Sequence, residues 1–505
     1  MDNLTNEIRR EMNVLHFSKA LTLLASIDDK DKTAADWLLT GICHAAIYDW
    51  NQARDDYLKA LSLSPSPLLA NRIRLRLVYL FTQTGVLDQA QKWYDQIDLP
   101  EADGKELSQE QAETAGDYLF YGALLAYEKS ELDRALSLAL KLAEKGDPTL
   151  GKIRCEAWTL AGDLYSAKGE LRKALDCYGQ SLRLLPSLPE SWRELRKALI
   201  LNNLADVYEQ FECYREAAGV YSQAWKCVMA TQDDQIFDLS GYKLEILLSM
   251  ANFYALKDAL DQAKELLAHA RPLAETIELP LQLYWKSRID YIGGLCELYS
   301  ENPKYNPFAK LFEAWQLQTR YLSVSPASCR EYLARTAYYA AYCYDEKIAG
   351  NVSQKELYDQ ALHEFELCYF KDPKFFLFCI ASVQNELGNL ASKTDPNSAF
   401  KLYSRAAKSY ETYLKRWPED QLAQTSLLAV LLNLFGVMNE MQLKENGIRM
   451  LTLFEMVARY LMRDVEGRPQ AQEAIIRLLD DDRLYALYPK RLEKIHDLLQ
   501  NQVLH

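Results

Sequence analysis

Residues 146–153 come closest to a catalytic motif in this sequence of 505 residues. They read GDPTLGKI and match the Gly-x4-Gly-Lys core of a phosphate-binding loop. That loop needs Ser or Thr where Ile153 stands, because the hydroxyl binds Mg²⁺, and it needs a strand before it, whereas residues 135–145 have a helical pattern. We therefore interpret Gly146 as the end of a helix, followed by a turn at Pro148.

The six His and ten Cys show no metal-ligand pattern. No two Cys form Cys-x-x-Cys, and no His stands near a second ligand type at helical spacing, so we predict neither a metal site nor a disulfide framework. Free thiols fit a reducing compartment. The chain also lacks the Gly-x-Ser-x-Gly of hydrolases and the Gly-x-Gly-x-x-Gly of dinucleotide sites. We predict no catalytic residue and no cofactor.

The run Asp480-Asp481-Asp482 is the densest acidic stretch near the C-terminus. Carboxylates in series could bind calcium or contact a peptide. The alternative is an exposed helix boundary before Arg483, because Asp is frequent at helix starts, and we favour that interpretation.

The composition favours helices and an acidic protein. There are 19 Gly, whereas average usage in a chain of this length would supply about 35, which βα turns require. The formal net charge is −13 and no long Lys/Arg block is present, so we expect no direct contact with nucleic acid.

The sequence contains no segment that would place the chain in a membrane. The N-terminal MDNLTNEIRREM is too charged for a signal peptide. The longest apolar stretch, Leu427 to Met438, is interrupted by Asn433 and is far shorter than the ~20 residues that span a bilayer. We expect a cytoplasmic protein without membrane insertion.

A repeat organises the chain. A small residue is followed four positions later by an aromatic residue in four places, and two weaker pairs, Ala135 with Ala139 and Ala263 with Leu267, continue the series. The anchor alanines are 37 to 46 residues apart, a period typical of helical repeats. The four clear pairs are Ala53 with Tyr57, Ala90 with Tyr94, Ala174 with Tyr178, and Ala217 with Tyr221.

Two segments carry the fuller pattern. Residues 155–186 contain Trp158, Gly162, Tyr165, Ala174, Tyr178 and Pro186, and residues 37–65 repeat most of these offsets. The pattern resembles the tetratricopeptide repeat, in which Trp, Leu-Gly, Tyr, Ala, Phe/Tyr, Ala and Pro occupy fixed offsets. The resemblance is specific over residues 34–275 and weak over 281–463.

The resemblance implies an all-α fold, a right-handed superhelical α-solenoid of about eleven helical hairpins. Small residues such as Gly41 and Gly162 would allow the two helices of a hairpin to touch. Pro65 and Pro186 would end second helices. We predict N-terminal capping helices at 1–33, a tetratricopeptide array at 34–278, degenerate repeats at 281–463 and C-terminal capping helices at 464–505.

In tetratricopeptide arrays the first helix of each hairpin lines the concave surface. Carried over position by position, this implies a set of partner-binding residues on five successive hairpins. They are Arg72, Tyr79, Gln83, Tyr127, Glu128, Glu156, Asp163, Asn202, Asp206, Gln210 and Asn252.

Within this set, Asp163, Asp206 and Asn252 occupy the same position of three successive repeats. Such a ladder of acceptors could bond the backbone of an extended peptide or receive its Lys and Arg side chains. The alternative is ordinary, because a concave helix face exposed to water must be polar in any case.

Our first hypothesis is a non-enzymatic scaffold or adaptor that binds a partner peptide or domain, one with a basic segment, on the concave surface. The second is a regulatory subunit or inhibitor of an enzyme or signalling factor that makes its contact through the irregular half, 281–505. We disfavour a peptide-sensing transcription regulator, because residues 1–33 are too short and acidic for a DNA-binding domain, and we disfavour an enzyme, because no constellation of residues supports one.

Overall fold

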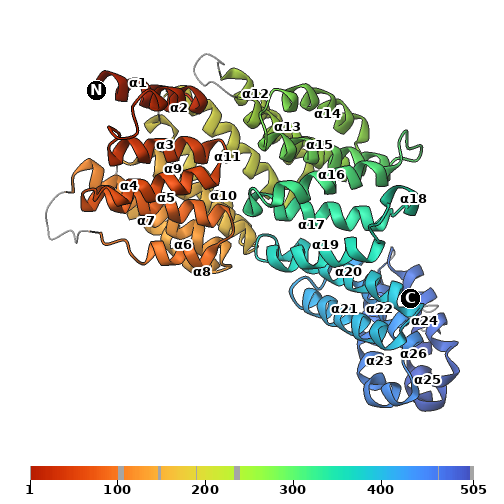
Figure 1. The fold of residues 1–505 in the computed structure, drawn as a ribbon. Coiled ribbons are helices and arrows are strands. Elements are labelled where there is room, and N and C mark those ends of the chain that lie inside the picture. The colour runs from red at the N-terminus through yellow and green to blue at the C-terminus, as the bar shows by residue number, and fades with distance from the viewer. Residues whose placement is uncertain are drawn as a thin grey trace. The chain divides into compact units, whose positions relative to one another are not determined.

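The computed structural model describes residues 2–99, 107–145, 149–188, 190–231, 239–464 and 466–500. These residues form helices and turns, with no strand among them. The chain divides into two compact units, Met1–Cys343 (unit 1) and Tyr344–His505 (unit 2), so the division falls inside the segment for which we predicted degenerate repeats. The predicted all-α solenoid of tetratricopeptide-like hairpins is confirmed (Figure 1).

Unit 1 consists of hairpins whose two helices follow each other in the chain and pack together. They are α1 (Asp2–Asn13) with α2 (Phe17–Ala25), α3 (Ala34–Ala46) with α4 (Trp50–Ser62), α5 (Pro67–Gln83) with α6 (Leu87–Tyr94), α7 (Gln109–Glu128) with α8 (Leu132–Lys145), α9 (Gly151–Ala167) with α10 (Leu171–Arg183), α11 (Glu190–Gln210) with α12 (Tyr214–Ala230), α13 (Ser240–Leu256) with α14 (Leu260–Glu275), and α15 (Leu281–Leu298) with α16 (Pro307–Leu322), before α17 (Pro326–Tyr342).

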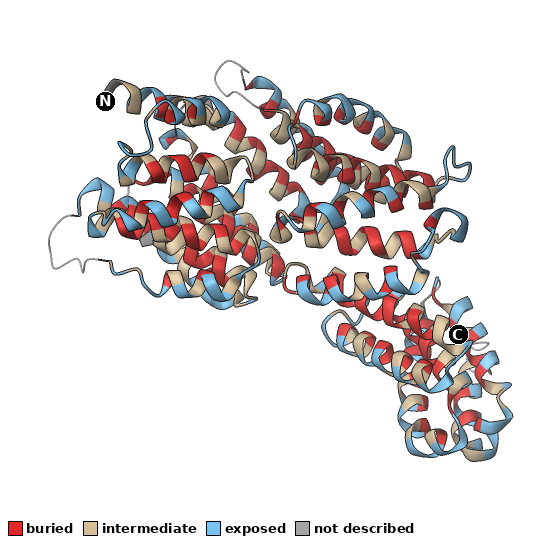
Figure 2. Cartoon of the chain, viewed as in Figure 1, coloured by how far each residue is buried: buried red, intermediate tan, exposed pale blue. Residues whose placement is uncertain are grey.

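Unit 2 continues the same construction. Its helices are α18 (Glu346–Ala349), α19 (Gln354–Cys368), α20 (Pro373–Ser392) with α21 (Pro396–Arg416), α22 (Gln421–Val437) with α23 (Glu440–Arg463), α24 (Arg468–Leu479), α25 (Asp482–Leu487) and α26 (Pro489–Gln500). Buried residues lie where neighbouring helices face each other, and exposed ones follow the outer sides (Figure 2).

The contact between a small residue and a tyrosine ring holds each clear hairpin together. A Cβ atom on Gly41 would lie 2.5 Å from the Tyr57 ring, and one on Gly162 would lie 2.6 Å from the Tyr178 ring. Gly388 and Tyr403 repeat this contact in unit 2, again at 2.6 Å. Glycine is required at these places because any side chain would displace the buried ring.

Local signals place the ends of the helices. Thr33, Ser108, Ser353 and Asn439 each form a capping box with the third residue of the helix that follows. Proline stands in the first turn of several helices, including α5 and α20. A backbone N–H in the first turn has no acceptor within the helix, so the absence of this group in proline costs no hydrogen bond.

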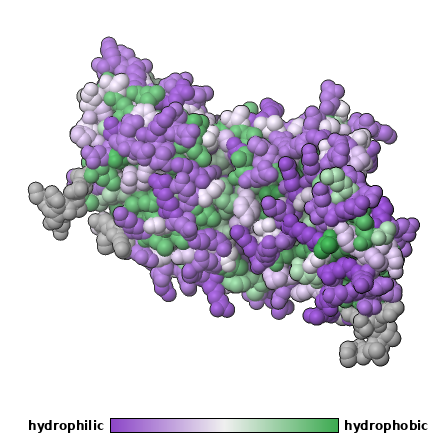
Figure 3. Space-filling view, turned by 90° about the horizontal axis from the view of Figure 1, so that it is seen from below, coloured by the Kyte–Doolittle hydropathy of each residue, from purple (hydrophilic) through white to green (hydrophobic). Residues whose placement is uncertain are grey.

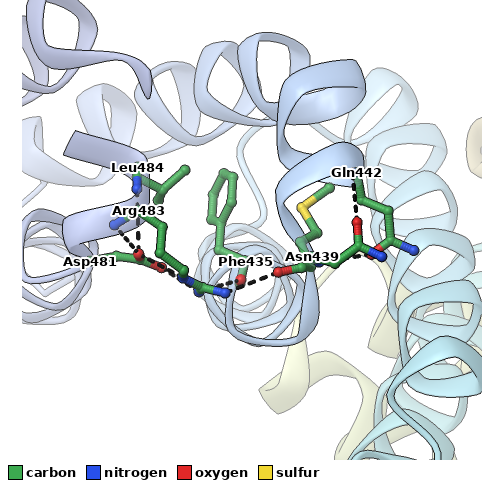
Figure 4. Close-up of polar contacts among 7 residues, drawn as sticks. Phe435, Asn439, Gln442, Asp481, Arg483 and Leu484 are labelled. Carbon is green, nitrogen blue, oxygen red and sulfur yellow. Dashed lines mark hydrogen bonds and ion pairs between the residues drawn. The ribbon is translucent and has the colours of Figure 1, made fainter. Parts of the chain in front are cut away.

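The acidic run at Asp480 is a helix boundary, as predicted. Asp481 accepts from the backbone N–H groups of Arg483 and Leu484 and so caps α25. The Arg483 guanidinium is held by the same carboxylate and donates to the carbonyls of Phe435 and Met438, both at 2.9 Å, at the end of α22 (Figure 4). A cation at this helix end also complements the helix dipole.

The acidic composition of residues 98–113, together with Pro100 and Gly104, predicts an exposed loop, but α7 begins at Gln109, and residues 100–106 lie outside the described part. The turn proposed at residues 146–148 lies outside it as well. The residues before it form helix α8 and not a strand, which is consistent with rejecting a phosphate-binding loop.

The first helices of unit 1 form an inner layer that closes on itself. Each of α5, α7, α9, α11, α13, α15 and α17 packs against the next one, and α17 returns to α5. A Cβ atom on Gly85, just after α5, would lie 3.6 Å from the Pro326 side chain, and the rings of Tyr48 and Tyr321 are 6.4 Å apart. Some side chains of this layer point away from the second helices of the hairpins. We call the surface that they form the inner face.

The close approach at Gly162 can be tested by adding one methyl group. We expect Gly162→Ala to lower the free energy of unfolding by about 1–3 kcal/mol, because the new Cβ must displace the Tyr178 ring. Gly179→Ala on α10 is the control, since its Cβ meets nothing within 4 Å. It should gain up to ~1 kcal/mol in helix propensity. Urea unfolding followed by circular dichroism measures both, and equal effects of the two substitutions would contradict the packing constraint.

Candidate functional site

The ladder residues Asp163 and Asp206 serve as acceptors for buried tyrosines. The Tyr178 hydroxyl donates to Asp163 Oδ1 at 2.6 Å, and Asn203 Nδ2 of the next hairpin donates to the same oxygen at 2.9 Å. Tyr221 donates to Asp206 Oδ1 in the same way. In unit 2, Tyr403 donates to Asn389 Oδ1 at 2.8 Å. Tyr178, Tyr221 and Tyr403 therefore each end on a side-chain acceptor of the first helix of their own hairpin.

Asn252 differs because the second helix of its hairpin, α14, has no tyrosine. Leu267 fills the corresponding place on α14 and offers no hydroxyl. Asn252 Oδ1 is buried and has no hydrogen-bond partner. The same is true of Oδ1 of Asn202, a residue only 5% exposed whose Nδ2 donates to Ser249 Oγ at 3.3 Å. The inner face of α11 and α13 thus carries acceptors that the described residues leave unsatisfied.

The surroundings raise the pKa of both ladder carboxyls. Protein atoms displace water around Asp163 and raise its pKa to about 6, against the lowering effect of the bonds from Tyr178 and Asn203. The same loss of water raises the pKa of Asp206 to about 7, and the neighbouring charges of Glu209, Glu245 and Asp163 add to the shift.

Most other charges of the inner face neutralise one another. Arg196 Nη2 lies 2.6 Å from Glu156 Oε1 across α11 and α9, and Lys257 Nζ lies 3.9 Å from Glu209. Arg76 Nη2 lies 4.0 Å from Asp117 Oδ2, and its Nη1 donates to the Tyr121 hydroxyl. Among the described residues, by contrast, no cation lies within ion-pair distance of Asp163 or Asp206. Asp163 and Asp206 are therefore carboxylates without a cationic partner on α9 and α11.

Arg288 is the most deeply buried charge of unit 1. Its side chain is 1% exposed, its Nη1 lies 2.7 Å from Glu245 Oε2, and the Tyr332 ring is 4.5 Å away. The Tyr284 and Trp285 rings stand at 5.6 and 5.4 Å. Arg288 therefore ties α13, α15 and α17 together through cation–π contacts and an ion pair. Sequence reasoning missed it because we carried inner-face positions only as far as the seventh hairpin.

The other predicted residues also lie on first helices of unit 1, but their contacts do not involve Asp163 or Asp206. Arg72 Nη1 pairs with Glu110 at 2.6 Å, the Tyr79 ring packs 5.6 Å from that of Tyr121, and Gln210 donates to Ser166 Oγ at 2.8 Å. Gln83, Tyr127 and Glu128 are partly exposed. Asp163 lies close enough to Asp206 for its charge to raise the pKa of Asp206, whereas Arg72 and Tyr79 are not among the groups that shift this pKa.

No group of three or more His, Cys, Asp or Glu side chains in the described part of the chain could hold a metal ion. All ten cysteines are free thiols. None of the helices in the described ranges is long and apolar enough to cross a membrane.

No protein-family model matches the sequence, and no curated protein is significantly similar to it. Among solved structures, a human IFIT1 dimer with m7Gppp-AAAA aligns over 91% of this chain and 94% of its own, with 16% identity and a TM-score of 0.40. A Rap protein complexed with competence and sporulation factor aligns over 74% and 100%, with 14% identity and a TM-score of 0.39.

A Rap conjugation regulator with the Phr* peptide aligns over 76% of this chain and 97% of its own, with 12% identity and a TM-score of 0.42. Similarities this distant carry no argument about ligands. One of these structures holds m7Gppp-AAAA and another holds a peptide, so the comparisons do not support our expectation that nucleic acid is excluded.

The raised pKa of Asp206 predicts a stabilising substitution. The folded state holds the Asp206 proton more tightly than the unfolded state does, so this group lowers stability as pH rises from about 4 towards 7. Asp206→Asn removes the charge and keeps an acceptor for Tyr221. We expect its Tm to exceed that of the wild type at pH 8 by about 1–2 °C, after allowing for solvent screening at this exposed carboxyl, and the gain to shrink at pH 5.5.

Asp206→Ala provides the comparison, because it removes both the charge and the acceptor. We expect it to be less stable than Asp206→Asn at every pH, since the Tyr221 hydroxyl loses its partner. Thermal unfolding followed by circular dichroism measures all three proteins. If Asn and Ala were equally destabilising at pH 8, the carboxylate charge would not be an unfavourable term in the folded state.

Proposed function

We propose that the chain is a non-catalytic adaptor whose inner face in unit 1 binds a basic segment of a partner protein. The observation that carries the proposal is the pair of carboxylates, Asp163 and Asp206, that no cation of the described chain neutralises. Each uses Oδ1 for a tyrosine, and no donor among the described residues reaches its Oδ2. A lysine or arginine side chain of a partner would supply the missing charge.

The energetics favour such a ligand over the empty face. Asp163 is half-buried, so an ion pair formed there is screened less than one on an open surface, whereas Asp206 is exposed and its ion pair would be screened more. Binding of a cationic side chain would therefore neutralise carboxylates that have no cationic partner in the folded chain by itself.

A nucleic acid fits this face less well. Its phosphates need free guanidinium or ammonium groups, whereas Arg196 and Arg288 are already bound by Glu156 and Glu245. Asp163 and Asp206 would repel a phosphate.

Raised carboxyl pKa values also occur in catalytic sites. Here both carboxyls hold packing tyrosines, and this role accounts for their positions without a reaction.

We place this adaptor in the cytoplasm. Its ten cysteines are free thiols, and eight of them are buried, which suits a reducing compartment.

Affinity capture with mass spectrometry tests the proposal. We expect the double variant Asp163→Asn/Asp206→Asn to lose about tenfold or more of the partner that the wild type captures, a loss of roughly 1.4 kcal/mol of binding. The substitutions keep the acceptors for Tyr178 and Tyr221, so the fold is preserved. The binding should also weaken as salt concentration rises.

The control variant is Asp133→Asn/Asp261→Asn, which removes the same charge from the second helices α8 and α14 and should capture normally. Capture that is unchanged in the Asp163/Asp206 variant would overturn the inner-face assignment. The wild type could instead capture RNA, and nuclease treatment could remove this RNA together with all captured protein. That result would show that the direct partner is a nucleic acid and not a protein.

A further inference from the structure

A groove opens in unit 2 between the second helices of two successive hairpins. Its volume is about 220 Å³, its walls come from α21 and α23, and the end of α22 forms its floor. Its apolar lining consists of Phe400, Leu434, Met438, Met450 and Leu453. Hydrophilic residues cover most of the face of the molecule that Figure 3 shows, with hydrophobic ones in smaller patches between them. A hollow with an apolar lining is the kind of surface on which proteins bind small ligands.

The charged residues that line the groove have one positive charge in excess. Lys408 on α21 and Arg449 on α23 are cations, and Glu411 on α21 is a carboxylate. Arg449 Nη2 lies 3.2 Å from Glu411 Oε2, and Lys415 Nζ, from outside the lining, lies 3.1 Å from Glu411 Oε1. Lys408 is exposed, and among the described residues no carboxylate lies within ion-pair distance of it. A single negative charge on a ligand would therefore balance the lining.

The volume of the groove limits the size of an occupant. A cavity of about 150 Å³ holds a benzene ring, whereas pockets for drug-sized ligands begin at about 300 Å³. The groove lies between these sizes and has room for one ring with a short chain. The two methionines of the lining have flexible side chains that can adapt to the shape of such a group.

We propose that the groove binds a small apolar monocarboxylate, with its ring on the apolar lining and its carboxylate beside Lys408 and Arg449. Burial of the ring removes apolar surface from water, and the carboxylate becomes the partner that Lys408 lacks within the described chain. Arg449 can take part because Lys415 also compensates Glu411. The inference concerns a different surface from the one in the proposed function and does not rest on it.

Other occupants match the groove less well. A phosphate monoester carries more negative charge than the lining has in excess, and it brings no apolar group. The walls are helices whose backbone groups are already bonded, so an extended peptide would find no strand edge to pair with. A second copy of this chain, related by a two-fold axis, would bring the cations of both copies into one interface. A free monocarboxylate matches the volume, the lining and the charge together.

Titration of the full chain with matched ligands, followed by ligand-observed NMR, tests the inference. Hydrocinnamate carries both a phenyl ring and a carboxylate, hydrocinnamide keeps the ring without the charge, and acetate keeps the charge without the ring. We expect hydrocinnamate to bind about tenfold or more tightly than either of the others. Equal affinity for hydrocinnamate and acetate, or for hydrocinnamate and hydrocinnamide, would contradict the inference.

Two variants locate the binding. Lys408→Gln should weaken the binding of hydrocinnamate about three- to tenfold and leave that of hydrocinnamide unchanged, because it removes only the charge. Ser404→Phe should abolish the binding of both, because a ring on this lining residue occupies the groove. Lys374→Gln, at an exposed lysine on α20 outside the groove, removes the same charge as the control and should bind hydrocinnamate as the wild type does. Circular dichroism checks the fold of each variant.

Three further results would overturn the inference. Hydrocinnamate binding that both Lys408→Gln and Ser404→Phe leave unchanged would place the site elsewhere. Tighter binding of acetyl-Gly-Gly-Phe with a free carboxyl end than of hydrocinnamate would assign the groove to the end of a partner peptide. A dimer in sedimentation that Ser404→Phe dissociates would assign it to a second copy of this chain. All these results leave the inner face of unit 1 untouched, because none of the variants lies there.

Discussion

The close packing of a tyrosine ring against a residue without a side chain is the constraint on which each clear hairpin depends. Gly41, Gly162 and Gly388 leave the space, and Tyr57, Tyr178 and Tyr403 fill it. A hairpin that is closed in this way still has apolar flanks, and only the next hairpin can cover them. The repeat is therefore both the unit of packing and the reason why the chain is long.

A buried tyrosine brings a hydroxyl with it, and this hydroxyl needs an acceptor. In two hairpins the acceptor is a carboxylate, Asp163 or Asp206, and in one it is Asn389. The packing requirement thus places negative charge on the inner face, where water is partly displaced and the carboxyl pKa rises. A structural need and the proposed binding surface coincide in the same side chains.

The two units offer different surfaces. In unit 1 the inner face carries several ion pairs, whereas Asp163 and Asp206 bond tyrosines and have no cationic partner among the described residues. In unit 2 a groove between α21 and α23 is bordered by Lys408 and Arg449.

The sequence by itself determined the helical repeat, because the spacing of Ala53, Gly162, Ala174 and Tyr178 is local information that each hairpin expresses within its own length. It also placed Asp163, Asp206 and Asn252 at one repeated position. Only the tertiary structure decided what those residues do, since the tyrosine that binds Asp163 lies on another helix and the tyrosine missing at Leu267 leaves Asn252 unsatisfied. The return of α17 to α5 and the burial of Arg288 depend on packing summed over many repeats, which no single period encodes.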